Sequence, residues 1–285
     1  MANEGFYLIL PSNVISNRHK NKTSHFYTDL PIPLELDKDK WEVALVEIDF
    51  PRSWNNVVRN RSRITLSRVD AKGKIFKQIF PLKSGHYNSE REIIRYANDR
   101  RNSVIKSYFQ FDEISKKAKI IIEQGESVQI SATLSHMMGF LQPVRFIHPT
   151  FYNVTPHDEE IVKIGHDTEL EIVPQPVKTR SVTVFGDKAF DLNNGLYSIY
   201  VYTNIIQDTI VGNTLAPLLR TVLASGNYGD IIQKTFVHPH YMRLAQDRIA
   251  DIEISLRDDT GNLIPFEFGK VLVKLHFRKK GLTLQ

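Results

Sequence analysis

The sequence contains no cysteine and no long apolar run. The lack of cysteine excludes disulfide frameworks, thiolate zinc sites, cysteine nucleophiles and iron–sulfur clusters. No stretch approaches the roughly 18 apolar residues that a membrane-spanning helix needs, so we expect no membrane span. The N-terminal residues Met-Ala-Asn-Glu-Gly do not begin a basic region followed by an apolar run. We therefore expect synthesis without a signal peptide.

The motifs of common catalytic sites are also missing. The glycines Gly125, Gly139 and Gly165 are isolated, so no glycine-rich phosphate loop is present. The sequence contains no Gly-x-Ser-x-Gly elbow and no His-Glu-x-x-His pair of metal ligands. Because a catalytic site needs converging acids, bases or metals, we expect no enzyme, no catalytic residue and no cofactor.

One histidine pair keeps an enzymatic alternative open. His238 and His240 are spaced to share one face of a strand, as the metal ligands of cupin-type jelly-roll enzymes do. However, Pro239 lies between them and the next acid is Asp247, so a surface turn without a metal is the favoured interpretation. Asp258 lies in the run Asp258-Asp259-Thr260-Gly261-Asn262, which lacks calcium-loop spacing and predicts a tight turn.

Period-two alternation of apolar residues dominates the rest of the chain and predicts a mainly β protein. The 285 residues are 41% hydrophobic and 24% charged, which is an ordinary globular balance. Pro31 and Pro33 predict an edge or a bend in one of the strands. The expected strands are Phe6–Leu10, His25–Leu36, Trp41–Phe50, Ser181–Phe185, Leu196–Ile206, Asp251–Arg257 and Val271–Phe277.

The middle of the chain predicts a different arrangement. Arg63–Val69 and Lys74–Leu82 are expected to form a hairpin, and Ser89 with Glu92 forms a capping box that opens a helix. A second hairpin and a short helix from about Ser131 to Gly139 follow. The predicted order is therefore strand-strand-helix-strand-strand-helix, an α+β subdomain inserted at residues 60–142. The remainder, 1–59 and 143–285, suits a single sandwich of about eight strands.

The net charge of +5 is unevenly distributed. Residues 1–150 hold 23 Lys and Arg against 16 Asp and Glu, whereas residues 151–285 hold 14 against 16. This excess makes a basic nucleic-acid-binding module a second alternative, with solvated surface loops as the other interpretation. The candidate basic residues are Arg18, Lys20, Lys22, Arg59, Arg61 and Arg63; Arg52 and Arg68 belong to the same clusters, and the C-terminal segment adds Arg278–Lys280.

Several blocks of the sequence, spread over residues 6–278, resemble one protein family. The most specific is the C-terminal block Ile252-Glu253-Ile254-Ser255-Leu256-Arg257-Asp258-Asp259-Thr260-Gly261 with Pro265-Phe266-Glu267-Phe268-Gly269-Lys270. Others are Phe6–Ser12, Tyr27–Pro31, Trp41–Ile48, Tyr200–Asn204, Val211–Thr214 and Pro217–Arg220. Together they resemble the minor capsid, or penton, proteins of Polinton (Maverick) virus-like transposons, which are related to virophage and adenovirus pentons.

This resemblance implies a single jelly roll that forms homopentamers at the vertices of an icosahedral particle, beside a major capsid protein with a double jelly roll. The expected location is the virion, after synthesis in the host cell, and the inserted subdomain would project outward. The resemblance brings no catalytic residues. The six candidate basic residues would then face packaged DNA, nonspecifically, or a capsid neighbour.

Overall fold

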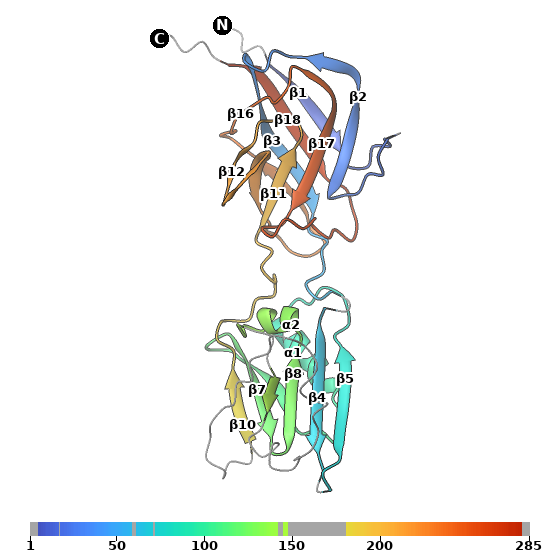
Figure 1. The fold of residues 1–285 in the computed structure, drawn as a ribbon, viewed down its shortest axis with the longest axis vertical. Helices are drawn as coiled ribbons and strands as arrows, with labels where there is room; N and C mark the ends of the chain where they lie inside the picture. Colours follow the sequence, from blue (N-terminus) through green and yellow to red (C-terminus); the bar gives the residue numbers. More distant parts are fainter. Residues whose placement is uncertain are drawn as a thin grey trace. The chain divides into compact units, whose positions relative to one another are not determined.

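The computed structural model describes residues 5–16, 18–58, 61–70, 72–141, 145–147 and 181–280. The chain forms two compact units, and each has its own hydrophobic core (Figure 1). Unit 1 comprises residues 1–54 and 196–285, and unit 2 comprises residues 55–195. The protein is mainly β, as predicted, with antiparallel pairing throughout the described sheets.

Unit 1 consists mainly of two antiparallel four-stranded sheets, the first of which also pairs with the short β16 (Met242–Arg243) at β3. In spatial order, the first sheet contains β1 (Gly5–Pro11), β18 (Leu272–Lys279), β3 (Trp41–Pro51) and β15 (Ile231–Thr235). The second contains β14 (Leu218–Leu223), β11 (Ser198–Thr203), β17 (Arg248–Arg257) and β2 (His25–Glu35).

The order of these eight strands identifies a jelly roll. Numbered along the chain, the first sheet holds strands one, eight, three and six, and the second holds strands five, four, seven and two. The chain therefore crosses between the sheets at almost every step, as two nested Greek keys require. The predicted single jelly roll is confirmed, and unit 2 is inserted between its third and fourth strands.

The jelly-roll core lies between the two sheets. Alternate residues of each strand point inward, such as Val273, Leu275 and Phe277 of β18 and Ile252 and Ile254 of β17. All of these side chains are completely buried. At about 25 cal/mol per Å² of apolar surface, this burial is the main stabilising contribution to the unit. The interior is filled with side chains.

The prolines of β2 act as the sequence predicted. β2 is the last strand of its sheet and pairs only with β17, so it is an edge strand. The pairing register jumps from Asp251–Asp29 to Ile249–Leu34, which leaves Leu30–Pro33 out of the ladder. Proline has no backbone N–H to donate, and an edge with a break in register tolerates this loss.

In the described part of unit 2, the chain forms two sheets and two helices, and their hydrophobic faces share one core. One sheet is β5 (Ile75–Pro81), β4 (Arg63–Val69), β8 (Glu126–Ile130) and β9 (Arg145–Ile147). The other is β10 (Ser181–Phe185), β7 (Lys117–Glu123) and β6 (Tyr108–Asp112). The helices are α1 (Glu90–Asp99) and α2 (Ala132–Met137).

Both helices of unit 2 begin where the sequence predicts. The Ser89 side chain accepts a hydrogen bond from the backbone N–H of Glu92, and the Glu92 carboxylate accepts one from the backbone N–H of Asn88. Ile93, Ile94 and Ala97 form the buried stripe of α1. Helix α2 begins after Ser131, and the chain then turns at Gly139, where φ is +85°.

The inserted unit extends further along the chain than the expected 60–142. Strand β10 pairs with β7 over five residues, and β9 pairs with β8, so both belong to unit 2. The sequence places Ser181–Phe185 in the jelly-roll half, and this assignment is wrong. The period-two pattern finds a strand, but only long-range pairing decides which sheet it joins.

Candidate assembly surfaces and basic loop

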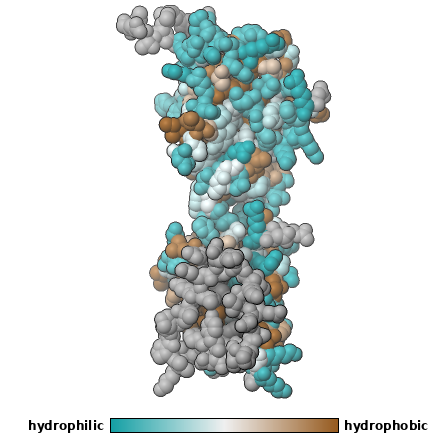
Figure 2. Space-filling model, in the orientation of Figure 1, coloured by the Kyte–Doolittle hydropathy of each residue, from teal (hydrophilic) through white to brown (hydrophobic). Residues whose placement is uncertain are grey.

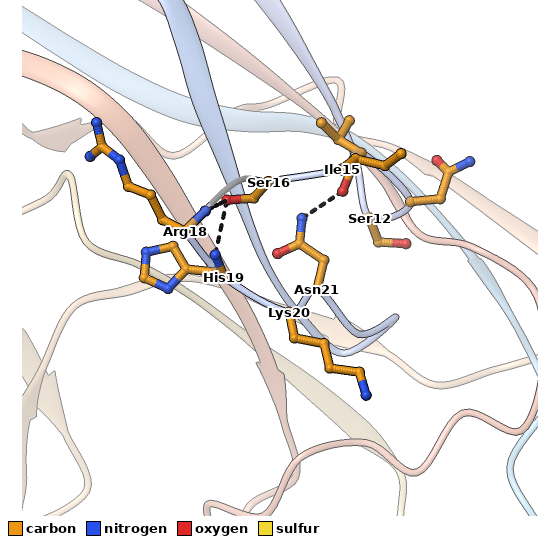
Figure 3. Close-up of a pocket in the computed structure, with 9 residues that line it drawn as sticks. Ser12, Ile15, Ser16, Arg18, His19, Lys20 and Asn21 are labelled. Atoms are coloured by element: carbon orange, nitrogen blue, oxygen red, sulfur yellow. Dashed lines mark hydrogen bonds between the residues drawn. The ribbon is translucent and has the colours of Figure 1, made fainter.

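The loop between β1 and β2 carries three of the predicted basic residues. Arg18, Lys20 and Lys22 are all exposed. The Ser16 side chain donates a hydrogen bond to Asp29 on β2 at 3.0 Å, and it accepts bonds from the backbone N–H groups of Arg18 and His19, both at 3.2 Å (Figure 3). The serine therefore ties this turn of the loop to the outer face of the second sheet.

Asn21 forms a second attachment of the same loop. Its side-chain nitrogen donates to the carbonyl oxygens of Val14 and Tyr27, and its oxygen accepts from the backbone N–H of Tyr27. The His19 ring stacks on the Tyr27 ring with 3.9 Å between centroids. Burial, followed by the charge of Glu253, raises the pKa of Tyr27, so this ring stays neutral at physiological pH.

The attached loop leaves its cations facing solvent. Within the described residues, no ion pair involves the three basic side chains of the loop. Their neighbours Ser16 and Asn21, in contrast, form hydrogen bonds, and His19 stacks on an aromatic ring. The open depression shown in Figure 3 is lined by this loop alone and brings no catalytic pair together. Its chemistry suits contact with an anionic surface.

The remaining predicted basic residues do not join this loop. Arg61 and Arg63 are exposed on unit 2, just before and at the start of β4, and Arg59 lies outside the described residues. The backbone around them is bound to Ser131, whose hydroxyl donates to the Arg61 carbonyl oxygen and accepts from the Arg63 N–H. The six candidates thus divide between two units.

Arg52 also departs from the expected basic surface. Its side chain is only 4% exposed, and the guanidinium lies 4.0 Å from the centre of the Trp54 ring. Burial lowers the pKa of Arg52, although an arginine remains charged at physiological pH. This side chain is therefore part of the packing around Trp54 and not of a phosphate-facing surface.

The positive net charge belongs to one of the two structural units and not to one half of the sequence. Unit 1 holds 16 Lys and Arg and 16 Asp and Glu, so it is neutral overall. Unit 2 holds 21 against 16, which accounts for the whole net charge of +5. The jelly roll therefore has no overall attraction to a polyanion, and any such attraction in unit 1 is local to its basic loop.

The histidine pair of the enzymatic alternative does not form a metal site in the described structure. His238 and His240 lie outside any strand, between β15 and β16, and the His238 carbonyl oxygen accepts a hydrogen bond from Arg220. Among the residues that the structure describes, no three His, Asp or Glu side chains converge on a point that could hold a metal ion. A cupin-type site also needs space inside the barrel, and here that space is filled.

Asp258 forms the predicted turn. Its carboxylate accepts hydrogen bonds from the backbone N–H groups of Thr260 and Asn262, at 3.0 and 2.8 Å, and from the Thr260 hydroxyl. These bonds close the loop between β17 and β18. The turn is therefore accounted for by backbone capping.

The outer face of the first sheet carries an aromatic cluster near its edge. Tyr7 of β1 stacks on His276 of β18 with ring centroids 4.4 Å apart, and the Tyr241 hydroxyl lies 2.7 Å from Nδ1 of His276. Burial, with a smaller effect from the Arg278 charge, lowers the pKa of His276. The ring is therefore neutral at physiological pH, and the cluster is flanked by two cations, Arg278 at 3.3 Å from the centre of the Tyr241 ring and Lys274 at 5.5 Å from that of Tyr7.

Exposed apolar side chains on unit 1 are candidate contact residues that the sequence did not identify. Two pairs stand out: Tyr7 and Ile9 on β1, and Ile210 and Leu215 on a hairpin formed by β12 (Thr209–Val211) and β13 (Thr214–Ala216). The Gly212–Asn213 turn between alternating residues was a signal for this hairpin. Adjacent exposed apolar side chains can mark a contact site, so we treat these residues as candidates for subunit contacts.

Within the described residues, no helix is long and apolar enough to span a membrane.

Comparisons with known proteins identify similar structures but no family. No family model matches the chain, and no curated protein matches it. The chain is similar to a crystal structure of the selenomethionine-labelled mavirus penton protein, at 11% identity and a TM-score of 0.47, covering 97% of this chain and 100% of the other. It is also similar to the cryo-EM structure of the Sputnik virophage, at 11% identity and a TM-score of 0.44, covering 99% of each chain.

These scores are too low to assign a function, so the jelly-roll fold rests on the strand order itself. The link to Polinton elements stays a prediction.

Proposed function

We propose that this protein is a structural minor capsid protein of the penton type, which forms homopentamers at the vertices of an icosahedral virus-like particle. The observation that carries the proposal is the eight-strand jelly roll with a separate unit inserted between β3 and β11. Jelly rolls are a recurrent building block of viral shells. The sequence blocks that resemble Polinton pentons support the same assignment.

A filled interior favours assembly over catalysis among the functions that jelly rolls perform. Cupin-type enzymes and lectins bind their ligands in pockets, whereas here the space between the sheets is occupied by side chains such as Phe26 and Phe50. The exposed apolar pairs lie on the outside of the same unit. A building block needs this distribution, because its binding energy comes from contacts between copies.

A fivefold ring sets requirements that the jelly roll can meet. Each copy must present two different surfaces, one for each neighbour, because ring contacts are heterologous. The neutral charge of unit 1 favours close approach of copies, since like-charged units would repel one another. We therefore place the subunit contacts on unit 1.

The inserted unit and the basic loop have separate roles in this proposal. Unit 2 is the part that projects outward from the shell, because it has its own core and is inserted between two consecutive strands of the jelly roll, β3 and β11. The basic loop of unit 1 faces packaged DNA or a neighbouring major capsid protein with a double jelly roll. The protein then resides in the virion after synthesis in the host cell.

Imaging of the purified chain tests the proposal. Negative-stain images of the protein at micromolar concentration should show rings with five lobes, and class averages should have fivefold rotational symmetry. Raising the salt concentration should leave the rings intact, since apolar contacts dominate the expected interface. Single isolated particles at every concentration, or rings of another symmetry, would contradict it.

A further inference from the structure

The β12–β13 hairpin is an unpartnered element of unit 1. Ile210 and Leu215 lie directly opposite each other in its register and are 81% and 69% exposed. Within the described residues, β12 and β13 pair only with each other. Figure 2 shows hydrophobic side chains at the margin of unit 1 where Figure 1 draws β12. A two-stranded hairpin alone is marginally stable in water, so an additional contact would stabilise it.

The edge of β1 is a second unpartnered element. β1 is the first strand of its sheet and pairs only with β18, over seven residues. No backbone hydrogen bond to another described segment occupies the free edge of Gly5–Leu10. Tyr7 and Ile9 point to the outer face, and each is 58% exposed. A long uncovered edge of this kind is a template for pairing with another chain.

The two elements also have complementary charges. Asp208 immediately precedes β12 and is exposed. Lys274 lies opposite Ile9 in the register of β1 with β18, and its Nζ atom is 5.5 Å from the centre of the Tyr7 ring. The apolar pair on the hairpin therefore lies next to a carboxylate, Asp208. The apolar pair at the β1 edge lies next to an amine of opposite charge, Lys274.

We infer that the β12–β13 hairpin of one copy adds to the free edge of β1 in a second copy of this chain. Strand addition supplies backbone hydrogen bonds, and the contact between the two apolar pairs supplies buried area. The two surfaces are different, so the contact is heterologous and forms a ring when its rotation closes. This inference rests on the proposed self-assembly and specifies the surfaces that carry it.

A charge-insertion variant tests the hairpin. In Ile210→Glu/Leu215→Glu, two carboxylates would have to enter the apolar contact, so we expect the concentration for half-dissociation of the oligomer to rise by about 100-fold or more. The matched control is Ile79→Glu/Ile114→Glu, which adds the same charge at isoleucines of unit 2 that are 53% and 96% exposed. The control should assemble like the wild type. Circular dichroism verifies that both variants fold.

Cysteine cross-linking tests the pairing itself and does not depend on the folding of a charged hairpin. Because the chain has no cysteine, Ile9→Cys/Leu215→Cys gives no background reaction. With a short bifunctional maleimide it should form a ladder of covalent multimers, whereas each single variant should remain monomeric on a denaturing gel. Dimers of Leu215→Cys alone would mean that hairpins pack on each other, and this would overturn the inference.

The outcomes separate this inference from the proposed function. Fivefold rings that persist unchanged in the charged hairpin variant, or intact rings without cross-links in the double cysteine variant, would overturn the hairpin contact and leave the penton assignment standing. A wild-type chain that stays monomeric at every concentration would overturn both. Loss of rings in the hairpin variant together with a ladder in the cysteine variant is the expected result.

Discussion

A buried carboxylate in unit 2 offers a sharp test of whether the two units are energetically independent. Glu126 on β8 is 1% exposed. Its Oε2 atom accepts hydrogen bonds from the backbone N–H and the hydroxyl of Ser107, at 2.7 and 2.6 Å, and from the backbone N–H of Lys106. Arg68 lies 3.7 Å from Oε1. The carboxylate therefore holds the loop before β6 against the sheet.

The size of the effect of Glu126→Ala follows from the groups that it leaves without an acceptor. Ser107 is 1% exposed, so its N–H and O–H would lose their partner in a buried position. Each of these two buried donors left unsatisfied costs about 1–3 kcal/mol, which gives about 2–6 kcal/mol for unit 2. With a urea m-value of about 2 kcal/mol per M, the unfolding midpoint of unit 2 should fall by about 1–3 M.

Tryptophan fluorescence distinguishes the units in this experiment. The chain has two tryptophans, Trp41 and Trp54, and both pack in the core of unit 1. Fluorescence therefore reports the unfolding of unit 1, whereas far-UV circular dichroism reports both units. In Glu126→Ala, the dichroism curve should lose amplitude at lower urea, and the fluorescence midpoint should stay where it is in the wild type.

The control for this test is Glu113→Ala. Glu113 forms an exposed ion pair with Arg91, and such pairs contribute about 0–1 kcal/mol, so neither curve should move by more than about 0.5 M. If Glu126→Ala shifts the fluorescence and dichroism curves together, the units unfold as one. That result would refute the reasoning from separate cores.

Two further predictions concern charge. A hydrogen bond from Lys119, with backbone N–H groups of the following turn, lowers the pKa of Asp112 to about 2. Because this pKa lies below the unfolded value, Asp112 stabilises the fold above about pH 4 and loses this effect as the pH falls toward 2. The urea midpoints of the wild type and Asp112→Asn should therefore converge between pH 5 and about 2, and a constant difference would contradict this. The second prediction concerns the triple variant Arg18→Ala, Lys20→Ala and Lys22→Ala. The slope of log binding constant against log salt concentration for nonspecific DNA should fall in magnitude by about 0.9 for each phosphate that the loop no longer neutralises. A slope equal to that of the wild type would exclude the loop from DNA binding.

Local patterns in the sequence predicted most elements of the fold. The capping box at Ser89 and the turn at Asp258 depend on residues a few positions apart, and the structure confirms both. The hairpin of β4 and β5 is likewise local, and its residues pair as expected. These features could be predicted because the groups that interact are neighbours in the chain.

Long-range pairing was the part that the sequence could not supply. The strands β14 and β15 were missed, because Leu218–Leu223 (Leu-Leu-Arg-Thr-Val-Leu) does not alternate with period two and Ile231–Thr235 is short. The strand at Ser181–Phe185 was found but placed in the wrong unit. The partners of β15 and β10 lie far away in the sequence, in β3 and β7, and no local signal specifies them.

The candidate basic surface shows the same limitation. Arg52, Arg61 and Arg68 are close in sequence, yet Arg52 is buried under Trp54 and Arg68 lies beside the buried Glu126. Near the C-terminus, Arg278 also forms an ion pair, with its Nε atom 2.7 Å from Oε1 of Glu42. Counting charges along a chain does not separate a solvated cation from one that packs against an aromatic ring.

The central claim is that five copies of this chain form one ring, and its mass in solution tests that claim most directly. Native mass spectrometry over a range of protein concentrations should find a dominant species of five times the chain mass of 32.9 kDa. The monomer should be the main smaller species at low concentration, because the contacts are heterologous and strengthen when the ring closes. A monomer that persists at the highest concentration, or a closed species with another number of copies, would contradict the account.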